Sequence, residues 1–159
     1  MKRMSTLFLK LSVIIVGIAS LAICTVAIPG FGIANSDEPE FVQFIFPILA
    51  CILTAFVPFF IALYQAWKLL GYIDRNVAFS ELSVRALKNI KDCALAACAV
   101  LSVNLVFFYR FAEKEDAPGL IVLGMASVFA SLVIALFAAV LQMLFKEAID
   151  IKAENELTV

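Results

Sequence analysis

Four long apolar runs, separated by short charged segments, dominate the pattern of hydrophobic and polar positions along the chain. Each run is close in length to the roughly 20 apolar residues that a helix needs to cross a hydrocarbon core about 30 Å thick. The pattern predicts an all-α fold: a polytopic membrane protein with a four-transmembrane-helix bundle, forming a single domain over residues 1–159. The expected spans cover about 11–28, 47–67, 93–109 and 118–145.

Proline residues mark the expected limits of these spans. The first span is expected to end at Pro29-Gly30. Pro47 and Pro118 suit the first turns of the second and fourth spans, where a missing backbone N–H does no harm. Pro58 lies in the middle of the second span and cannot donate a hydrogen bond to the carbonyl four residues earlier, so we expect a kink there.

Composition agrees with membrane insertion and narrows the chemistry. Hydrophobic residues make up 64% of the chain and the net charge is −1, so the lipid bilayer is the expected environment and no direct contact with nucleic acid is expected. Histidine is absent, no Asp, Glu, Lys or Arg falls inside a span, and the four cysteines lack the spacing of a zinc or redox site. We therefore expect no catalytic, cofactor or metal site, and no enzyme activity.

The positive charges are distributed unevenly between the connections. Of the 12 Lys and Arg residues, ten lie before the first span, in the loop 68–92 or in the tail 146–159, and two lie between the third and fourth spans. Short loops rich in Lys and Arg stay on the cytoplasmic side of the membrane. The sequence therefore predicts a multi-pass protein of the bacterial cytoplasmic (inner) membrane with both termini in the cytoplasm.

The loop before the third span predicts a helix that begins outside the membrane. Ser80 is a suitable N-cap, and Phe79 is expected to pack on Val84 in the first turn. Val84, Leu87 and Ile90 recur at helical spacing, with no helix breaker before the span. The fourth helix likewise continues past residue 145 and is expected to end near Asn155. Helices three and four of the bundle are thus expected to extend into the cytoplasm.

Two alternatives remain open for the basic residues of this extension. They can pair with acidic residues of the tail, or they can contact anionic lipid headgroups. The basic residues are Arg85, Lys88 and Lys91, and the acidic ones are Glu147, Asp150 and Glu154.

Small and polar residues inside the spans indicate how the helices pack. Small side chains allow close approach of helices in lipid, and the fourth span carries Ser127, Ser131 and Ala135 at four-residue spacing, which we expect to face inward. Asn104 is among the deepest polar residues. We expect it to form an interhelical hydrogen bond in preference to a ligand site.

Three segments resemble one known family. The segments LLGYIDRNVAFS at 69–80, RALKNI at 85–90 and AENELTV at 153–159 are similar to the YoaS-like family of small bacterial four-helix membrane proteins of unknown function. Members of that family are often encoded beside a very small helix-turn-helix regulator. The resemblance implies a regulatory partnership, and it supplies no catalytic residues.

Two functions follow as hypotheses. The first is a regulatory or scaffold protein that binds a cytoplasmic partner, such as a small helix-turn-helix regulator. The second is a transporter-like bundle that binds a small molecule or lipid in a cavity near Pro58 and Asn104; a homo-oligomer remains a third alternative. A water-accessible cavity at mid-depth favours the second and a dry core the first. The residues expected to bind the partner are Asp74, Arg75, Phe79, Ser80, Arg85, Lys88, Lys91, Glu154 and Leu157.

Overall fold

The computed structural model of the chain describes residues 2–34, 36–37, 39 and 41–158, and almost all of these are helical. Four of its helical rods are long and apolar enough to cross a membrane, which confirms the predicted all-α class with four candidate spans. The elements are α1 (Lys2–Ala22), the π-helical turn η1 (Ile23–Ala27), α2 (Ile28–Ala34), the π-helical turn η2 (Phe41–Ile45), α3 (Phe46–Asp74), α4 (Glu81–Glu115) and α5 (Gly119–Leu157).

The first rod does not end at Pro29-Gly30, as the sequence predicted, but continues through α2 to Ala34. Proline lacks the N–H that would bond to the carbonyl four residues earlier, which here belongs to Thr25. The preceding turn is widened instead: the backbone N–H of Ile28 bonds to the carbonyl of Ile23, five residues back. A π-helical turn of this kind lets a helix absorb a local irregularity without stopping.

The second rod begins with η2 and continues into α3. Pro47 occupies the first turn of α3, as expected for a residue without a backbone N–H, and α3 runs unbroken through Pro58. α3 ends where Asn76 takes a left-handed conformation with φ 59°, and the N–H of Val77 bonds to the carbonyl of Tyr72 at 3.0 Å. α4 ends in the same way: Asp116 has φ 52°.

The two long C-terminal helices are uninterrupted, as predicted. α4 begins after Ser80, whose backbone is extended and whose carbonyl accepts the N–H groups of Ser83 and Val84. Ser80 therefore holds the N-cap position, although its hydroxyl makes no cap hydrogen bond. α5 starts after Pro118 and ends at Leu157, two residues beyond the predicted Asn155.

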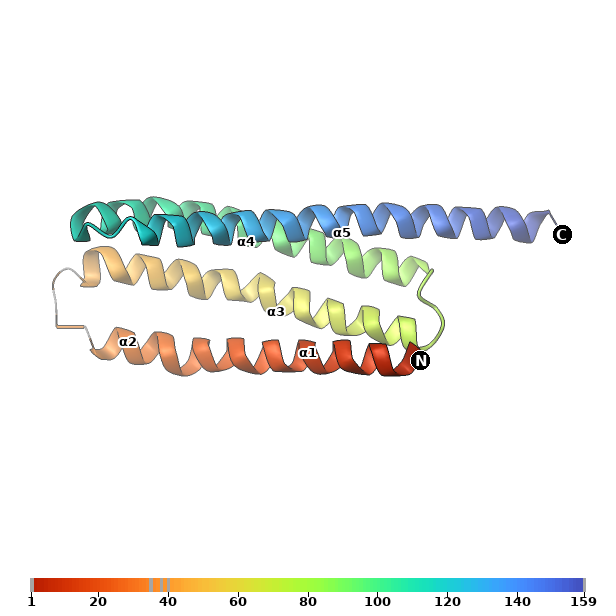
Figure 1. Cartoon of the computed structure of the whole chain (residues 1–159), viewed down its shortest axis with the longest axis horizontal. Coiled ribbons are helices and arrows are strands. Elements are labelled where there is room, and N and C mark those ends of the chain that lie inside the picture. The colour runs from red at the N-terminus through yellow and green to blue at the C-terminus, as the bar shows by residue number, and fades with distance from the viewer. Residues whose placement is uncertain (1, 35, 38, 40, 159) are drawn as a thin grey trace.

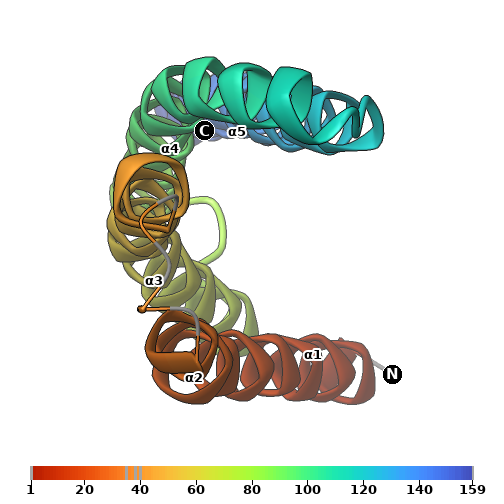
Figure 2. The ribbon, with the colours of Figure 1, turned by 90° about the vertical axis from the view of Figure 1, so that its left-hand side faces the viewer.

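The helices are arranged as an open arc, whereas the sequence predicted a four-helix bundle. Each rod packs against the next along the chain: α1 contacts α3, α3 contacts α4, and α4 contacts α5 most extensively. Figure 2 shows the resulting C-shaped layer, with α1 and α5 at its two edges. Among the described residues α1 and α5 share no extensive contact, so the inner side of the arc is open.

The two ends of the arc differ. We call the end with the start of α1, the 75–80 loop and the last turns of α5 the terminal end, and the opposite end, with the connection before η2 and residues 116–118, the hairpin end. Figure 1 shows that α5 runs well beyond the other helices at the terminal end. Whether that end lies in the cytoplasm remains a prediction.

Candidate functional site

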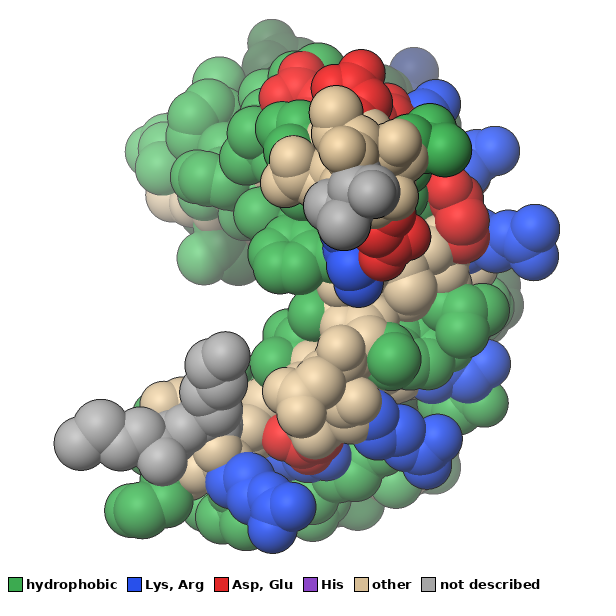
Figure 3. All heavy atoms as spheres, turned by 90° about the vertical axis from the view of Figure 1, so that its right-hand side faces the viewer, with side chains coloured by type: hydrophobic (Ala, Val, Ile, Leu, Met, Phe, Trp, Pro, Cys, Tyr) green, Lys and Arg blue, Asp and Glu red, His purple; other side chains and the backbone are tan. Residues whose placement is uncertain are grey.

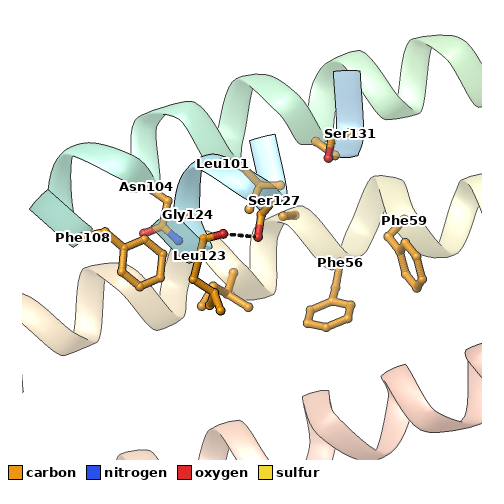
Figure 4. A pocket seen from close by; sticks show the side chains of 12 residues that line it. Phe56, Phe59, Leu101, Asn104, Phe108, Leu123, Gly124, Ser127 and Ser131 are labelled. Carbon is orange, nitrogen blue, oxygen red and sulfur yellow. Dashed lines mark hydrogen bonds between the residues drawn. The ribbon is translucent and has the colours of Figure 1, made fainter. Parts of the chain in front are cut away.

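An apolar groove runs along the inner side of the arc, where α3, α4 and α5 meet. Its larger hollow, toward the hairpin end, has a volume of about 310 Å³. Phe56 and Phe59 of α3 form one wall, and Ser127 and Ser131 of α5 lie on another, as Figure 4 shows. The two phenyl rings lie edge to face with their centroids 5.9 Å apart, which is a favourable geometry for an aromatic pair.

A second hollow continues the groove toward the terminal end. It has a volume of about 220 Å³ and shares Phe59, Ala97 and Ser131 with the first. Pro58 and Ile90 also line it. Phe108 is the α4 residue that lines the groove nearest the hairpin end, and from Asn104 to Ile90 the groove follows α4 over about 21 Å at 1.5 Å per residue.

Asn104 is the polar centre of the larger hollow. Asn104 is 1% exposed, and neither its Oδ1 nor its Nδ2 has a hydrogen-bond partner. Figure 4 shows the amide pointing from α4 toward Gly124 and Leu123 of α5. The interhelical hydrogen bond predicted for Asn104 is thus not formed, because the facing side of α5 offers a glycine and a leucine. An unsatisfied buried polar group costs about 1–3 kcal/mol.

Gly124 brings α5 close to α4 beside this amide. A Cβ atom at position 124 would lie 2.8 Å from Cδ1 of Leu105 and 3.3 Å from the ring of Phe108, so only glycine fits without a shift of these side chains. Sequence analysis missed Gly124, although it lies one turn before Ser127 and continues the small-residue stripe. Phe56, Phe59 and Phe108 were also missed, since phenylalanine is common on lipid-facing surfaces as well.

The small-residue stripe of α5 faces the interior of the arc. Ser127 and Ser131 line the groove half-buried, and Ala135 is 3% exposed. The Ser127 hydroxyl donates to the carbonyl of Leu123 at 2.9 Å, so its proton is used within its own helix. The stripe therefore serves close packing and leaves Asn104 without a donor or acceptor from it.

The residues predicted to bind a partner lie at the terminal end, but the structure does not gather all of them. Asp74 forms an ion pair with Lys10 of α1. Asp74 lies seven residues beyond the apolar run that ends at Trp67. Hydrogen bonds from Lys10 and Thr6 lower the pKa of its carboxyl group below the usual value. Arg75 is exposed beside it.

Phe79 packs on α5. Its ring lies 5.2 Å, centroid to centroid, from that of Phe145, while Val84, its expected packing partner, is buried in α4. Ser80 precedes the first turn of α4, and its hydroxyl has no partner. The contact between Phe79 and Phe145 thus joins the 75–80 loop to the point where α5 leaves the arc.

Of the two alternatives for the basic face of α4, pairing with the acidic tail is not formed in the described part of the chain. Arg85 and Lys88 are exposed and Lys91 is half-buried. Among the described residues, the ion pair within 4 Å joins Lys10 to Asp74, and none joins α4 to the tail. The reason is the length of α5, whose last turns extend beyond the other helices at this end (Figure 1). Glu154 and Leu157, both exposed, therefore lie apart from the basic residues.

Acidic side chains gather at the tip of α5. Figure 3 shows Asp and Glu side chains around the tip, with Lys or Arg beside them and more Lys and Arg over the rest of this end. Residues 146–157 contain two Lys and four Asp or Glu. Within the described part of the chain, no group of three or more His, Cys, Asp or Glu is placed to hold a metal ion.

Comparison with known proteins gives a family and no reaction. The family described as "Protein of unknown function (DUF2975)" matches residues 30–159. The uncharacterised membrane protein YoaS of Bacillus subtilis (strain 168) is 50% identical to this chain over 160 residues, covering 100% of both chains. No solved structure matches the chain. The match supports the predicted YoaS-like family and a location in a membrane.

Proposed function

We propose that this chain, which belongs to the DUF2975 family of proteins of unknown function, is a membrane-embedded regulatory or scaffold protein. Its four-helix arc would anchor it, and the projecting end of α5 would bind a partner in the cytoplasm. The observation that carries the proposal is the length of α5. This helix has 39 residues, about 58 Å at 1.5 Å per residue, nearly twice the roughly 30 Å of a hydrocarbon core.

The projecting end of α5 has the features of a protein-binding surface. Residues 150–158 are all exposed, and two of them are large and apolar: Ile151 at 61% and Leu157 at 87% exposure. Apolar residues set among charges on one helix suit docking against another helical protein. The excess of two negative charges over residues 146–157 favours a partner with a basic surface.

A small DNA-binding regulator has the required chemistry, because its DNA-binding face is basic. The resemblance to the YoaS-like family independently implies such a partner. An acidic helix that covers this face would compete with DNA, so the membrane protein would hold the regulator away from its binding site. Binding and release of the partner would then couple an event at the membrane to transcription.

The test is co-purification of the full chain with a small helix-turn-helix regulator of the kind often encoded beside members of the YoaS-like family, both expressed together and extracted in mild detergent. We expect the wild-type chain to retain the regulator. The triple variant Glu147→Lys, Asp150→Lys and Glu154→Lys should retain at least tenfold less, because it reverses the charge of the tip.

The matched control is Glu113→Lys with Glu115→Lys, which reverses exposed charges at the hairpin end of α4. The control should bind as the wild type does. If the wild type retains no regulator, or if the triple variant retains as much as the control, the proposal is wrong.

A further inference from the structure

The groove beside Asn104 has a property that the proposed function does not use: its lining is mainly apolar, and it includes the buried amide of Asn104. The buried amide of Asn104 offers two donors and an acceptor, and none of them has a partner. The residues that line the two hollows include no Asp, Glu, Lys or Arg. A ligand group that matches this site is neutral and able both to donate and to accept a hydrogen bond.

We propose that the groove binds a single-chain membrane lipid whose neutral hydroxyl group hydrogen-bonds to the Asn104 amide. A hydroxyl can donate a hydrogen bond to the amide oxygen of Asn104 and can accept one from its amide nitrogen. A carboxylate or an ammonium group would enter the hydrocarbon core without an opposite charge, which is strongly unfavourable.

The dimensions of the groove select one chain. Its hollows of about 310 Å³ and 220 Å³ lie near the lower limit of roughly 300 Å³ for small-molecule sites. A transmembrane helix about 10 Å wide and 21 Å long would fill about 1,600 Å³, several times more. The groove therefore fits a narrow chain, whereas a second copy of this protein would have to occupy the open side of the arc.

The direction of the groove matches that of a lipid in the leaflet at the hairpin end. Asn104 lies six residues before Arg110, the first charged residue of α4 toward the hairpin end, which places the amide about 9 Å below it. From there the groove leads about 21 Å toward Ile90, more than the roughly 15 Å depth of one leaflet. A lipid would enter from the open side of the arc, with its hydroxyl at Asn104 and its chain crossing the midplane.

The test uses two photoreactive probes, hexadecanol and hexadecane, each carrying a diazirine in mid-chain. The full-length protein in lipid nanodiscs is labelled with each, and labelled peptides are quantified by mass spectrometry. We expect hexadecanol to label the groove residues of α3, α4 and α5 about tenfold more than hexadecane, as one hydrogen bond to a buried amide predicts.

Two variants and a control complete the test. Asn104→Leu should abolish the difference between the probes, and it should remain folded because it removes an unsatisfied polar group. Ala97→Phe should lower labelling by both probes, since Ala97 lines both hollows. Ser102→Ala is the control, because its exposed hydroxyl bonds within α4 to the carbonyl of Cys98 and lines neither hollow; it should label as the wild type does.

Equal labelling of wild-type groove residues by the two probes would overturn the proposal. So would labelling by hexadecanol that is the same in Asn104→Leu as in the wild type. If a Ser131→Cys variant forms a disulfide-linked dimer in the membrane and its groove peptides are not labelled, a second copy occupies the groove and the lipid does not. Loss of the regulator in the co-purification experiment has no bearing on these outcomes.

Discussion

The two outer helices of the arc are held by different means. α5 packs on α4 through small residues along its length, and Gly124, Ala135 and Ala138 are all buried. α1 approaches α3 less closely: a Cβ atom at Gly17 would lie at an ordinary contact distance of 3.9 Å from Leu63. Association without a hydrophobic driving force depends on such close approach, so the α4–α5 pair is expected to be the stable half.

Polar contacts at the terminal end add to the looser packing of α1 on α3. Lys10 of α1 forms the ion pair with Asp74 and lies 5.7 Å from the centre of the Trp67 ring. Both contacts lie near the point where α3 leaves the apolar run. One edge of the arc is thus held by close helix packing, and the other by polar contacts near one end of its helix.

The largest effect on stability is expected from a substitution that disrupts the packing of α5 on α4. Gly124→Leu should lower the free energy of unfolding by about 1–3 kcal/mol, because a side chain there collides with Leu105 and Phe108. The measurement is thermal unfolding of the purified chain in detergent, followed by circular dichroism. Gly119→Leu is the control, since no atom lies within 4 Å of a Cβ at that position. Equal midpoints for the two variants would contradict the role of Gly124.

A smaller effect is expected from glycine-to-alanine substitutions, which should change stability differently at the two edges. Gly17→Ala should raise the free energy of unfolding by about 0.5–1 kcal/mol, since alanine costs less entropy in a helix and its Cβ has room. Gly124→Ala should gain less or lose stability, because its Cβ would meet Leu105 at 2.8 Å. The same unfolding measurement compares them. A larger gain at position 124 than at position 17 would show that the packed edge is not the tighter one.

The smallest effect on stability is expected from the ion pair between Lys10 of α1 and Asp74. The pKa of Asp74 is lowered in the folded chain, so its contribution to stability is present above the unfolded value of 3.8 and is lost as the pH falls through the lowered value. The thermal midpoint of the wild type should therefore fall more than that of Asp74→Asn over this acidic range. Parallel midpoints for the two chains would show that the ion pair does not stabilise the fold.

The sequence was sufficient to predict the helices but not their arrangement. Uncharged runs identify spans because a charged side chain is costly in hydrocarbon, and this rule found four candidate spans. The sides that pair are harder to find, because a transmembrane helix is apolar all round. Ser127, Ser131 and Ala135 identified one face of α5, while nothing comparable indicated that, among the described residues, α1 would pack mainly on α3 and leave the arc open.

Proline and asparagine misled the prediction for physical reasons. Pro29 ends many helices in water, but in an apolar run the backbone has no solvent to bond to, and the π-helical turn at Ile23–Ala27 keeps the helix going. Asn104 was expected to be a deep polar residue, and the structure buries it between helices. Its missing partner could not be predicted, because it depends on the register that places Gly124 and Leu123 opposite the amide.

The continuity of α5 has a mechanical consequence. Ser127 and Ser131 in the wall of the groove and Leu157 at the tip belong to one unbroken helix of 39 residues. From Ser131 to Leu157 the helix measures about 39 Å, so a tilt of α5 at the groove is carried to its tip as along a rigid rod. Tilting it by a few degrees at the groove sweeps the tip sideways by several ångströms, and bilayer thickness alone is enough to change such a tilt.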